Sequence, residues 1–367
     1  MKIFRFACAA TIAIAWSLDA TAAMADDAAK PDTSGIAALF AASGITLSGY
    51  LAASYSKSTG YPLNIHQFDV RHDSFQLDQA GLIVAYQPKE GFGALLDLMA
   101  GEDARILHAA EDGNDNAFDL RQAFVQYTRG SLTLTAGKML TLAGAELINP
   151  TSNSNFSRSL LFFDSEPLTH TGVRASLALS DTFTLTAGLN NGWNSTSTSH
   201  GSKTGEIGFG WVPNKRFSLL GAAYIGKTDP DFGGNDARKS LFDLVATYNA
   251  TPSLSFVLNI DVNQWDDALG VGRDAQWNGI AGYVNYAIDE QWRVSVRAEC
   301  LHDKDGLLTG TPQTLKEGTL TFGYSPTKSF ELRLEGAGAG GLVGRALQAG
   351  AHFRHAADFD HGLVGGA

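Results

Sequence analysis

A period-two alternation of apolar and polar side chains, running from Gly44 to the end of the chain, is the feature that most constrains the fold. Its clearest stretches are residues 45–55, 183–190, 254–262, 292–298 and 330–335. Successive side chains of a β-strand point to opposite faces, so this pattern predicts strands with one apolar and one polar face. A helical membrane protein is excluded, because no run of about 18 apolar residues follows residue 25.

The connections between these stretches alternate in length. We expect about sixteen strands, starting near residues 44, 74, 91, 118, 131, 169, 182, 203, 216, 241, 253, 276, 291, 315, 329 and 345. Short turns are expected at 87–91, 128–130, 180–181, 213–215, 250–252, 289–290 and 325–328, and long polar connections at 57–73, 102–117, 141–168, 227–240, 263–275 and 302–314. Short turns on one side and long loops on the other are typical of an antiparallel transmembrane β-barrel with short periplasmic turns and long external loops.

Aromatic residues and composition agree with a barrel. An interfacial girdle is predicted beside the short turns, at Tyr86, Phe92, Tyr127, Phe183, Trp211, Phe217, Tyr248, Trp292, Tyr324 and Phe330. The alternation Gln76-Leu77-Asp78-Gln79 is broken, which suggests a β-bulge. With 40 glycines among 367 residues and a net charge of -11, the chain is rich in turn residues and has no basic surface for nucleic acid.

The N-terminus has the pattern of an export signal. Lys2 and Arg5 precede an apolar stretch at 6–16, and Ala23-Met24-Ala25 is a small-x-small cleavage site, with 20–22 as a competing one. Residues 1–25 are therefore predicted to be a signal peptide. We further expect a leader at 26–43, a barrel domain at 44–353 whose last strand ends on Phe353, and a tail at 354–367. After cleavage Cys300 is the single cysteine, so no internal disulfide is expected.

The polar faces of the strands predict a water-filled lumen. Their inward charges are Arg174, Glu206, Asp243, Asp261, Arg293, Arg297, Glu299, Glu331, Arg333 and Glu335. Some of these charges, such as Arg297 and Glu299, are expected either to pair with each other or to bias permeation. The negative net charge favours a weak preference for cations.

The third long connection, residues 141–168, carries Glu146, Arg158, Asp164 and Glu166 beside the apolar run 160–163. An apolar patch in such a loop needs a surface to pack on, which favours folding inward onto the barrel wall. The alternative is an external loop that covers the barrel or contacts a neighbouring subunit.

The stretch from about 137 to 174 resembles the OmpL-like outer-membrane porins, the beta-barrel porin 2 family. The resemblance rests on Gly137-Lys138-Met139, Gly144-Ala145-Glu146, Asn155-Phe156-Ser157-Arg158-Ser159, Pro167 and Thr169-His170-Thr171-Gly172-Val173-Arg174. It implies a solute-permeable barrel of the bacterial outer membrane, without cofactor or catalytic residues, in which Glu146, Arg158 and Arg174 line the pore or anchor the loop. Outer-membrane barrels usually end on an aromatic residue, whereas about fourteen residues follow Phe353 here.

Neither catalysis nor metal binding is predicted. The histidines are scattered, with no third ligand at a recognised spacing, and the acidic residues 112–115 resemble a calcium loop only loosely. The predicted function is therefore passive diffusion of small hydrophilic solutes and ions, with outer-membrane lipid and lipopolysaccharide as surroundings and a homotrimer left open. Two alternatives remain: a structural or adhesion barrel with an occluded lumen, and a soluble periplasmic β-rich binding protein.

Overall fold

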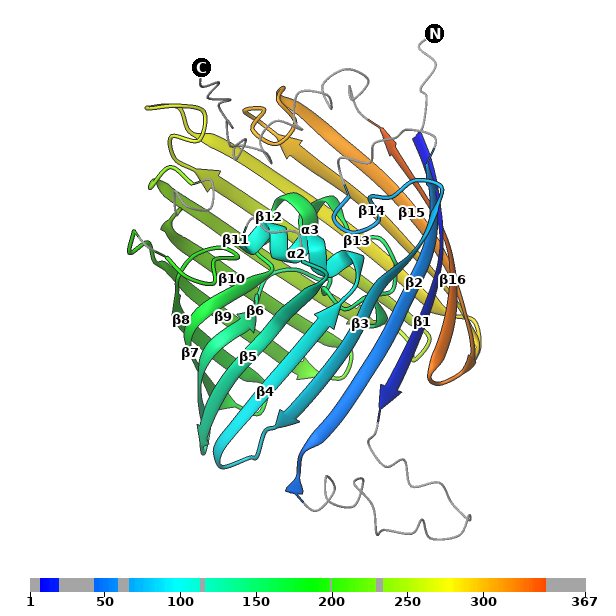
Figure 1. Cartoon of the computed structure of the whole chain (residues 1–367), viewed down its shortest axis with the longest axis horizontal. Coiled ribbons are helices and arrows are strands. Elements are labelled where there is room, and N and C mark those ends of the chain that lie inside the picture. Colours follow the sequence, from blue (N-terminus) through cyan, green and yellow to red (C-terminus); the bar gives the residue numbers. More distant parts are fainter. Residues whose placement is uncertain are drawn as a thin grey trace, which may run out of the picture.

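The chain folds into a single antiparallel barrel (Figure 1). The structure, a computed structural model, describes residues 7–19, 43–58, 66–112, 116–198, 200–228 and 234–340. Within these residues sixteen strands form one closed sheet in which each strand pairs with its neighbours in the sequence, and β1 closes the ring by pairing with β16.

The strands are joined by alternating short and long connections, as the sequence predicts. They are β1 (Ala7–Asp19), β2 (Thr46–Ser58), β3 (Ser74–Tyr86), β4 (Gly91–Ala100), β5 (Phe118–Arg129), β6 (Leu132–Leu140), β7 (Thr169–Ser180), β8 (Phe183–Asn190), β9 (Thr204–Asn214), β10 (Phe217–Lys227), β11 (Arg238–Asn249), β12 (Leu254–Trp265), β13 (Ala275–Ala287), β14 (Trp292–Asp303), β15 (Gln313–Thr327) and β16 (Phe330–Gly340). From β2 to β16 every strand begins within three residues of its expected start.

The two faces of the sheet are those that the alternation predicts. On β12, Phe256, Leu258 and Val262 are exposed on the outside, whereas Asn259 and Asp261 are buried inside. A sheet with exposed apolar and buried polar residues is the reverse of a soluble protein and suits a barrel surrounded by lipid.

Local details of the strands also follow the sequence. The pairing of β2 with β3 shifts register opposite Asp78, which confirms the predicted bulge. Aromatic side chains beside the short turns contact each other across strands: the ring centroids of Trp292 and Tyr324 are 4.4 Å apart, and those of Phe92 and Tyr127 are 4.8 Å apart. Such pairs stiffen the end of the barrel at which the short turns lie.

One strand comes from an unexpected segment. Residues 7–19, which lie within the predicted signal peptide, form β1 and pair on one side with β16 and on the other with β2. The predicted strand near 345–353, its terminal Phe353 and the tail at 354–367 lie outside the described residues, as does most of the leader at 26–43.

In the described parts of the long connections lie three short helices: α2 (Glu102–Asp112), the 3-10 helix η1 (Pro150–Ser152) and α3 (Leu160–Asp164). Figure 1 shows α2 and α3 inside the ring of strands, where α2 contacts β3 to β5 and α3 contacts β13 and β14. Among the described residues, no helix is both long and apolar enough to cross a membrane.

Candidate pore constriction

Residues 141–168 fold into the barrel and are bonded to its inner wall. Glu335 on β16 accepts hydrogen bonds from the backbone N–H groups of Phe156 and Ser157, at 2.7 and 2.9 Å. The hydroxyl of Thr321, on β15, donates to the same carboxylate at 2.6 Å. A carboxylate that accepts several such donors forms strong, charge-assisted bonds, so this part of the loop is fixed to the wall.

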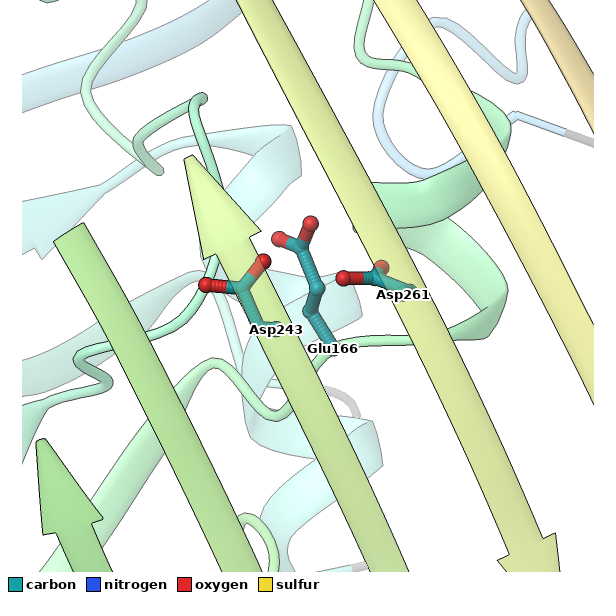
Figure 2. A group of neighbouring side chains, drawn as sticks. All are labelled: Glu166, Asp243 and Asp261. Atoms are coloured by element: carbon teal, nitrogen blue, oxygen red, sulfur yellow. The ribbon is translucent and has the colours of Figure 1, made fainter. Parts of the chain in front are cut away.

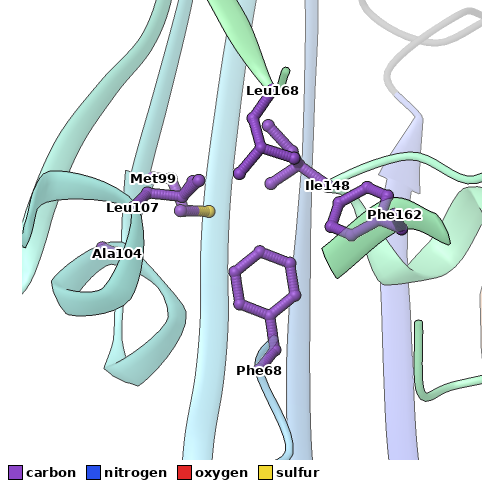
Figure 3. Close-up of a cluster of buried hydrophobic side chains, with 7 residues drawn as sticks. All are labelled: Phe68, Met99, Ala104, Leu107, Ile148, Phe162 and Leu168. Atoms are coloured by element: carbon purple, nitrogen blue, oxygen red, sulfur yellow. The ribbon is translucent and has the colours of Figure 1, made fainter. Parts of the chain in front are cut away.

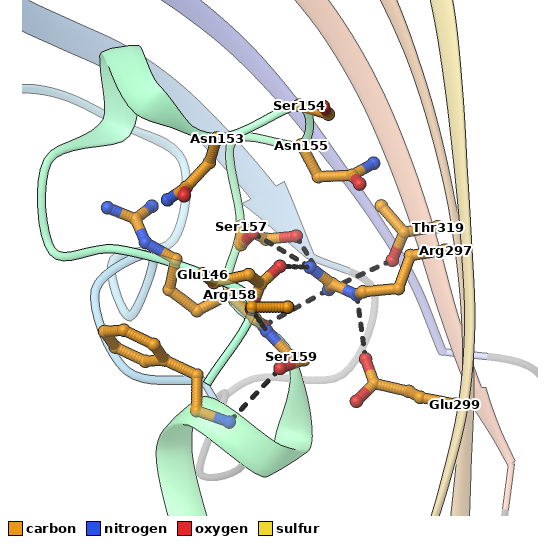
Figure 4. Close-up of polar contacts among 12 residues, drawn as sticks. Glu146, Asn153, Ser154, Asn155, Ser157, Arg158, Ser159, Arg297, Glu299 and Thr319 are labelled. Carbon is orange, nitrogen blue, oxygen red and sulfur yellow. Dashed lines mark hydrogen bonds and ion pairs between the residues drawn. The ribbon is translucent and has the colours of Figure 1, made fainter. Parts of the chain in front are cut away.

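A buried arginine is the centre of the loop's second attachment (Figure 4). The guanidinium of Arg297, on β14, forms ion pairs with Glu146 of the loop at 2.9 Å, Glu299 of the same strand at 2.8 Å and Glu317 of β15 at 2.9 Å. It also donates to the backbone carbonyl of Ser157 at 2.9 Å. The planar fork of arginine suits this role, because it holds several acceptors at once.

The apolar run of the loop packs on the wall and on other loops. Leu160 contacts Trp277 and Leu301 of the wall, while Leu161 lies against Tyr283. Phe162 belongs to a cluster inside the barrel, shown in Figure 3, that also contains Phe68, Met99, Ala104, Leu107, Ile148 and Leu168. The loop therefore has an apolar core of its own in addition to its polar attachments.

Three carboxylates meet where the loop lies against β11 and β12 (Figure 2). Glu166 of the loop, Asp243 of β11 and Asp261 of β12 each place an oxygen within 4.8 Å of the others. All three side chains are buried, and Asp243 lies directly opposite Asp261 in the β11–β12 register. Burial next to the two aspartates raises the pKa of Glu166 well above its usual range.

The remaining lumen charges of the wall form two ion-pair groups. Glu331 accepts from Arg293 at 2.5 Å and from Arg333 at 2.7 Å. Arg174 of β7 pairs with Glu206 of β9 at 2.6 Å. These charges are satisfied within the wall, as one of the two sequence interpretations expected.

Arg158 lies inside the loop itself. Its guanidinium donates to the backbone carbonyls of Leu147 and Ile148, at 3.0 and 2.6 Å, and lies 5.0 Å from the ring centroid of Phe68. Burial lowers the pKa of Arg158. Arg158 thus holds the two limbs of the loop together and does not face open solvent.

Several interior residues are absent from the sequence prediction. Arg121 of β5 makes a two-pronged ion pair with Asp97 of β4, at 2.7 and 2.8 Å. His66 pairs with Asp69 at 2.6 Å and lies 3.7 Å from Glu317. Asp97, Arg121 and Glu317 occupy inward-facing positions in the alternation of β4, β5 and β15, so the alternation could have identified them. His66 and Asp69 lie in a connection and follow no strand pattern.

Two cavities lie beside the loop, one toward each end of the barrel. The larger, of about 780 Å3, is on the long-loop side and is lined by Asp164 and Glu166 together with Trp193, Lys239 and Trp265. The second, of about 390 Å3, lies near the short turns, and residues 151–154 of the loop form part of its lining. Residues 141–168 therefore border both cavities.

An antiparallel barrel with an apolar exterior, a charged interior and an inward-folded third loop defines a porin-type outer-membrane protein. A family model described as beta-barrel porin-2, OmpL-like, matches residues 44–339. The chain belongs to this porin family of the bacterial outer membrane, and the resemblance carried by residues 137–174 is confirmed. No curated protein matches the chain.

Solved porin structures are similar to the chain at very low sequence identity. OmpT of Vibrio cholerae in its trimer form is 9% identical, with a TM-score of 0.50, over 93% of this chain and 100% of that one. An anion-selective porin from Comamonas acidovorans is 11% identical, with a TM-score of 0.49, over 92% of this chain and 99% of that one. At such identities the likeness concerns the fold alone.

Proposed function

We propose that the chain forms a water-filled channel for passive diffusion of small hydrophilic solutes and ions, narrowed by residues 141–168. The observation that carries this proposal is the loop's position, bonded to the wall through Glu335 and Arg297 and bordered by a cavity on each side. A constriction held this way selects solutes by size and by the charges beside it.

Planar-bilayer conductance tests the proposal. Wild-type protein should form discrete channels, and deletion of residues 150–165 should enlarge both the conductance and the largest sugar that enters. Folding of both proteins is checked by heat-modifiable migration in SDS gels. Folded wild type that forms no channels would instead favour the structural or adhesion barrel with an occluded lumen.

We further propose a weak preference for cations. The chain carries a net charge of -11. A net negative charge on the protein attracts cations to the channel and repels anions. The reversal potential in a tenfold KCl gradient should have the sign of cation transport, and a potential of anion sign contradicts this.

The strand β1 lies within the predicted signal peptide, which would be cleaved off on export. We propose that residues 1–25 are removed and that the predicted strand 345–353 then takes the place of β1. β1 is antiparallel to both β2 and β16, and a strand that follows β16 through a hairpin would have the same direction. Without a replacement, the edges of β2 and β16 would be left unpaired in lipid.

Mass spectrometry of protein from outer membranes tests this exchange. The mature chain should begin at Asp26, and a variant truncated after residue 340 should fail to give a heat-stable barrel. A mature chain that retains residues 7–19 would overturn the proposal. Chemical cross-linking of the same membranes tests for a homotrimer, which the sequence leaves open.

A further inference from the structure

The carboxylates of Glu166, Asp243 and Asp261 are buried together. None of the three forms an ion pair with a lysine, arginine or histidine in the part of the chain that the structure describes. Yet the side chains of Asp243 and Asp261 are fully buried, and that of Glu166 is 7% exposed. Like charges at this separation in a site screened from water require a counterion or protons.

One side-chain amide, that of Asn259, holds both aspartates of the cluster in place. The amide of Asn259 donates to Oδ2 of Asp243 at 2.7 Å and to Oδ1 of Asp261 at 3.3 Å. Its own oxygen accepts from the backbone of Ala145 in the loop at 2.8 Å. Asn259 thus occupies one oxygen of each aspartate and fixes both against the loop.

Two of the remaining oxygens are left without a partner. Oδ2 of Asp261 and Oε1 of Glu166 are buried atoms to which no group in the described structure donates, while the backbone N–H of Gly144 in the loop interacts with the Asp243 carboxylate. Figure 2 shows the three carboxylates turned toward one another from separate elements. Buried polar atoms are normally satisfied, so buried carboxylate oxygens that face each other without a donor suit the coordination of a cation.

The loop backbone is shaped to admit Glu166. Gly144 has a φ of +91°, and a Cβ added there would lie 2.0 Å from Oε2 of Glu166. Only glycine leaves room for the carboxylate beside the aspartates. Glu166 also lines the 780 Å3 cavity, so the cluster lies next to that cavity.

We propose that Glu166, Asp243 and Asp261 bind a divalent cation of the size of Ca²⁺. Carboxylate oxygens are the donors that hard cations prefer, and Ca²⁺ takes them at about 2.3–2.6 Å. Ligand oxygens within 4.8 Å of one another fit around one such ion. The ion links β11 and β12 to the loop and supplies the positive charge that this side of the constriction lacks.

Calorimetric titration with CaCl2 tests the site directly. The protein is refolded from inclusion bodies in detergent, so that no lipopolysaccharide contributes calcium sites, and is first dialysed against EDTA at pH 7.5. We expect one Ca²⁺ per chain and a rise in melting temperature on addition of the ion. Asp261→Asn and Glu166→Gln should each weaken binding at least about tenfold. Both variants remove like-charge repulsion, and Glu166 lies in a loop, so folding should persist.

Asp181→Asn is the matched control. It removes the same charge from an exposed short turn, which is separated from Glu166 by the whole length of β7, and should bind Ca²⁺ as the wild type does. Folded wild type that binds no calcium, or variants that bind it unchanged, would overturn the proposal and leave shared protons as the compensation. Equal loss in Asp181→Asn would overturn it too, because binding would then follow net charge. None of these readouts depends on conduction, so they are independent of the channel function.

Discussion

Two sites inside the barrel each bring three carboxylates together where the loop meets the wall, and they differ in where the positive charge comes from. At the first site Glu146, Glu299 and Glu317 surround the guanidinium of Arg297. At the second site none of the three carboxylates forms an ion pair with a basic side chain in the described part of the chain. At the first site, therefore, the positive charge that compensates the buried acids comes from the chain itself. At the second site it comes from a cation taken from solution.

Removal of the positive charge at the first site should have the largest effect. Arg297→Met leaves three buried carboxylates without compensation, for which we expect a loss of about 3–5 kcal/mol in the free energy of unfolding. The loop should detach, so that single-channel conductance rises. Urea unfolding in detergent and bilayer recording measure the two effects.

Two further variants make this result interpretable. Arg297→Lys keeps the charge with fewer donors and should be intermediate, while Arg216→Met removes a charge from an exposed turn and should change neither property. If Arg297→Met were as stable as the wild type, the proposed distinction between the two sites would be wrong.

A second positively charged side chain, that of His66, lies beside the first site. His66 lies beside Asp69 and Glu317 and not far from Arg297, and although burial lowers the pKa of His66, the Asp69 carboxylate outweighs it and raises the pKa to about 9. The pKa of His66 is higher in the folded protein than the value of 6.5 that it has in the unfolded chain. The stabilisation by protonated His66 is therefore complete below pH 6.5 and is lost as the pH rises to about 9. The shift corresponds to roughly 3 kcal/mol.

Urea midpoints measured between pH 6 and pH 9.5 check this expectation. The wild-type midpoint should fall across that window, and His66→Gln should give a flatter profile with lower stability at pH 6. Asp69 contributes no slope there, because the pKa of its carboxyl is held below its usual range. An unchanged slope in His66→Gln would show that another group titrates.

The glycine that shapes the second site allows a smaller perturbation. Gly144→Ala places a Cβ on a backbone of positive φ and against Glu166, for which we expect a cost of about 1–2 kcal/mol. It should also reduce calcium affinity, because Glu166 must move. Gly130→Ala is the control: it has a φ of +58° in a short turn with open space around it, so its strain should leave calcium binding intact.

The sequence alone predicts much of the fold and every member of the two sites except Glu317, but not how these residues group. The period-two alternation predicts that four of these charged residues face the lumen: Asp243, Asp261, Arg297 and Glu299. The short turn at 250–253 fixes the register of β11 and β12, which sets Asp243 opposite Asp261. The position of Glu166 depends on how a 28-residue connection folds back, which is set by long-range packing and not by a local period. For the same reason Glu317, although it faces inward, could not be assigned to Arg297.

A positive charge introduced at the second site tests the difference between the two sites most directly. Glu166→Lys would place an ammonium between Asp243 and Asp261, as Arg297 stands among its three glutamates. In EDTA the variant should be more stable than the wild type by about 1 kcal/mol, since charge pairing then exceeds the cost of burying the lysine. It should bind no calcium, and its reversal potential should move toward anions. If calcium still stabilised the variant as it does the wild type, the ion would act elsewhere, and the two sites would not differ in the way proposed.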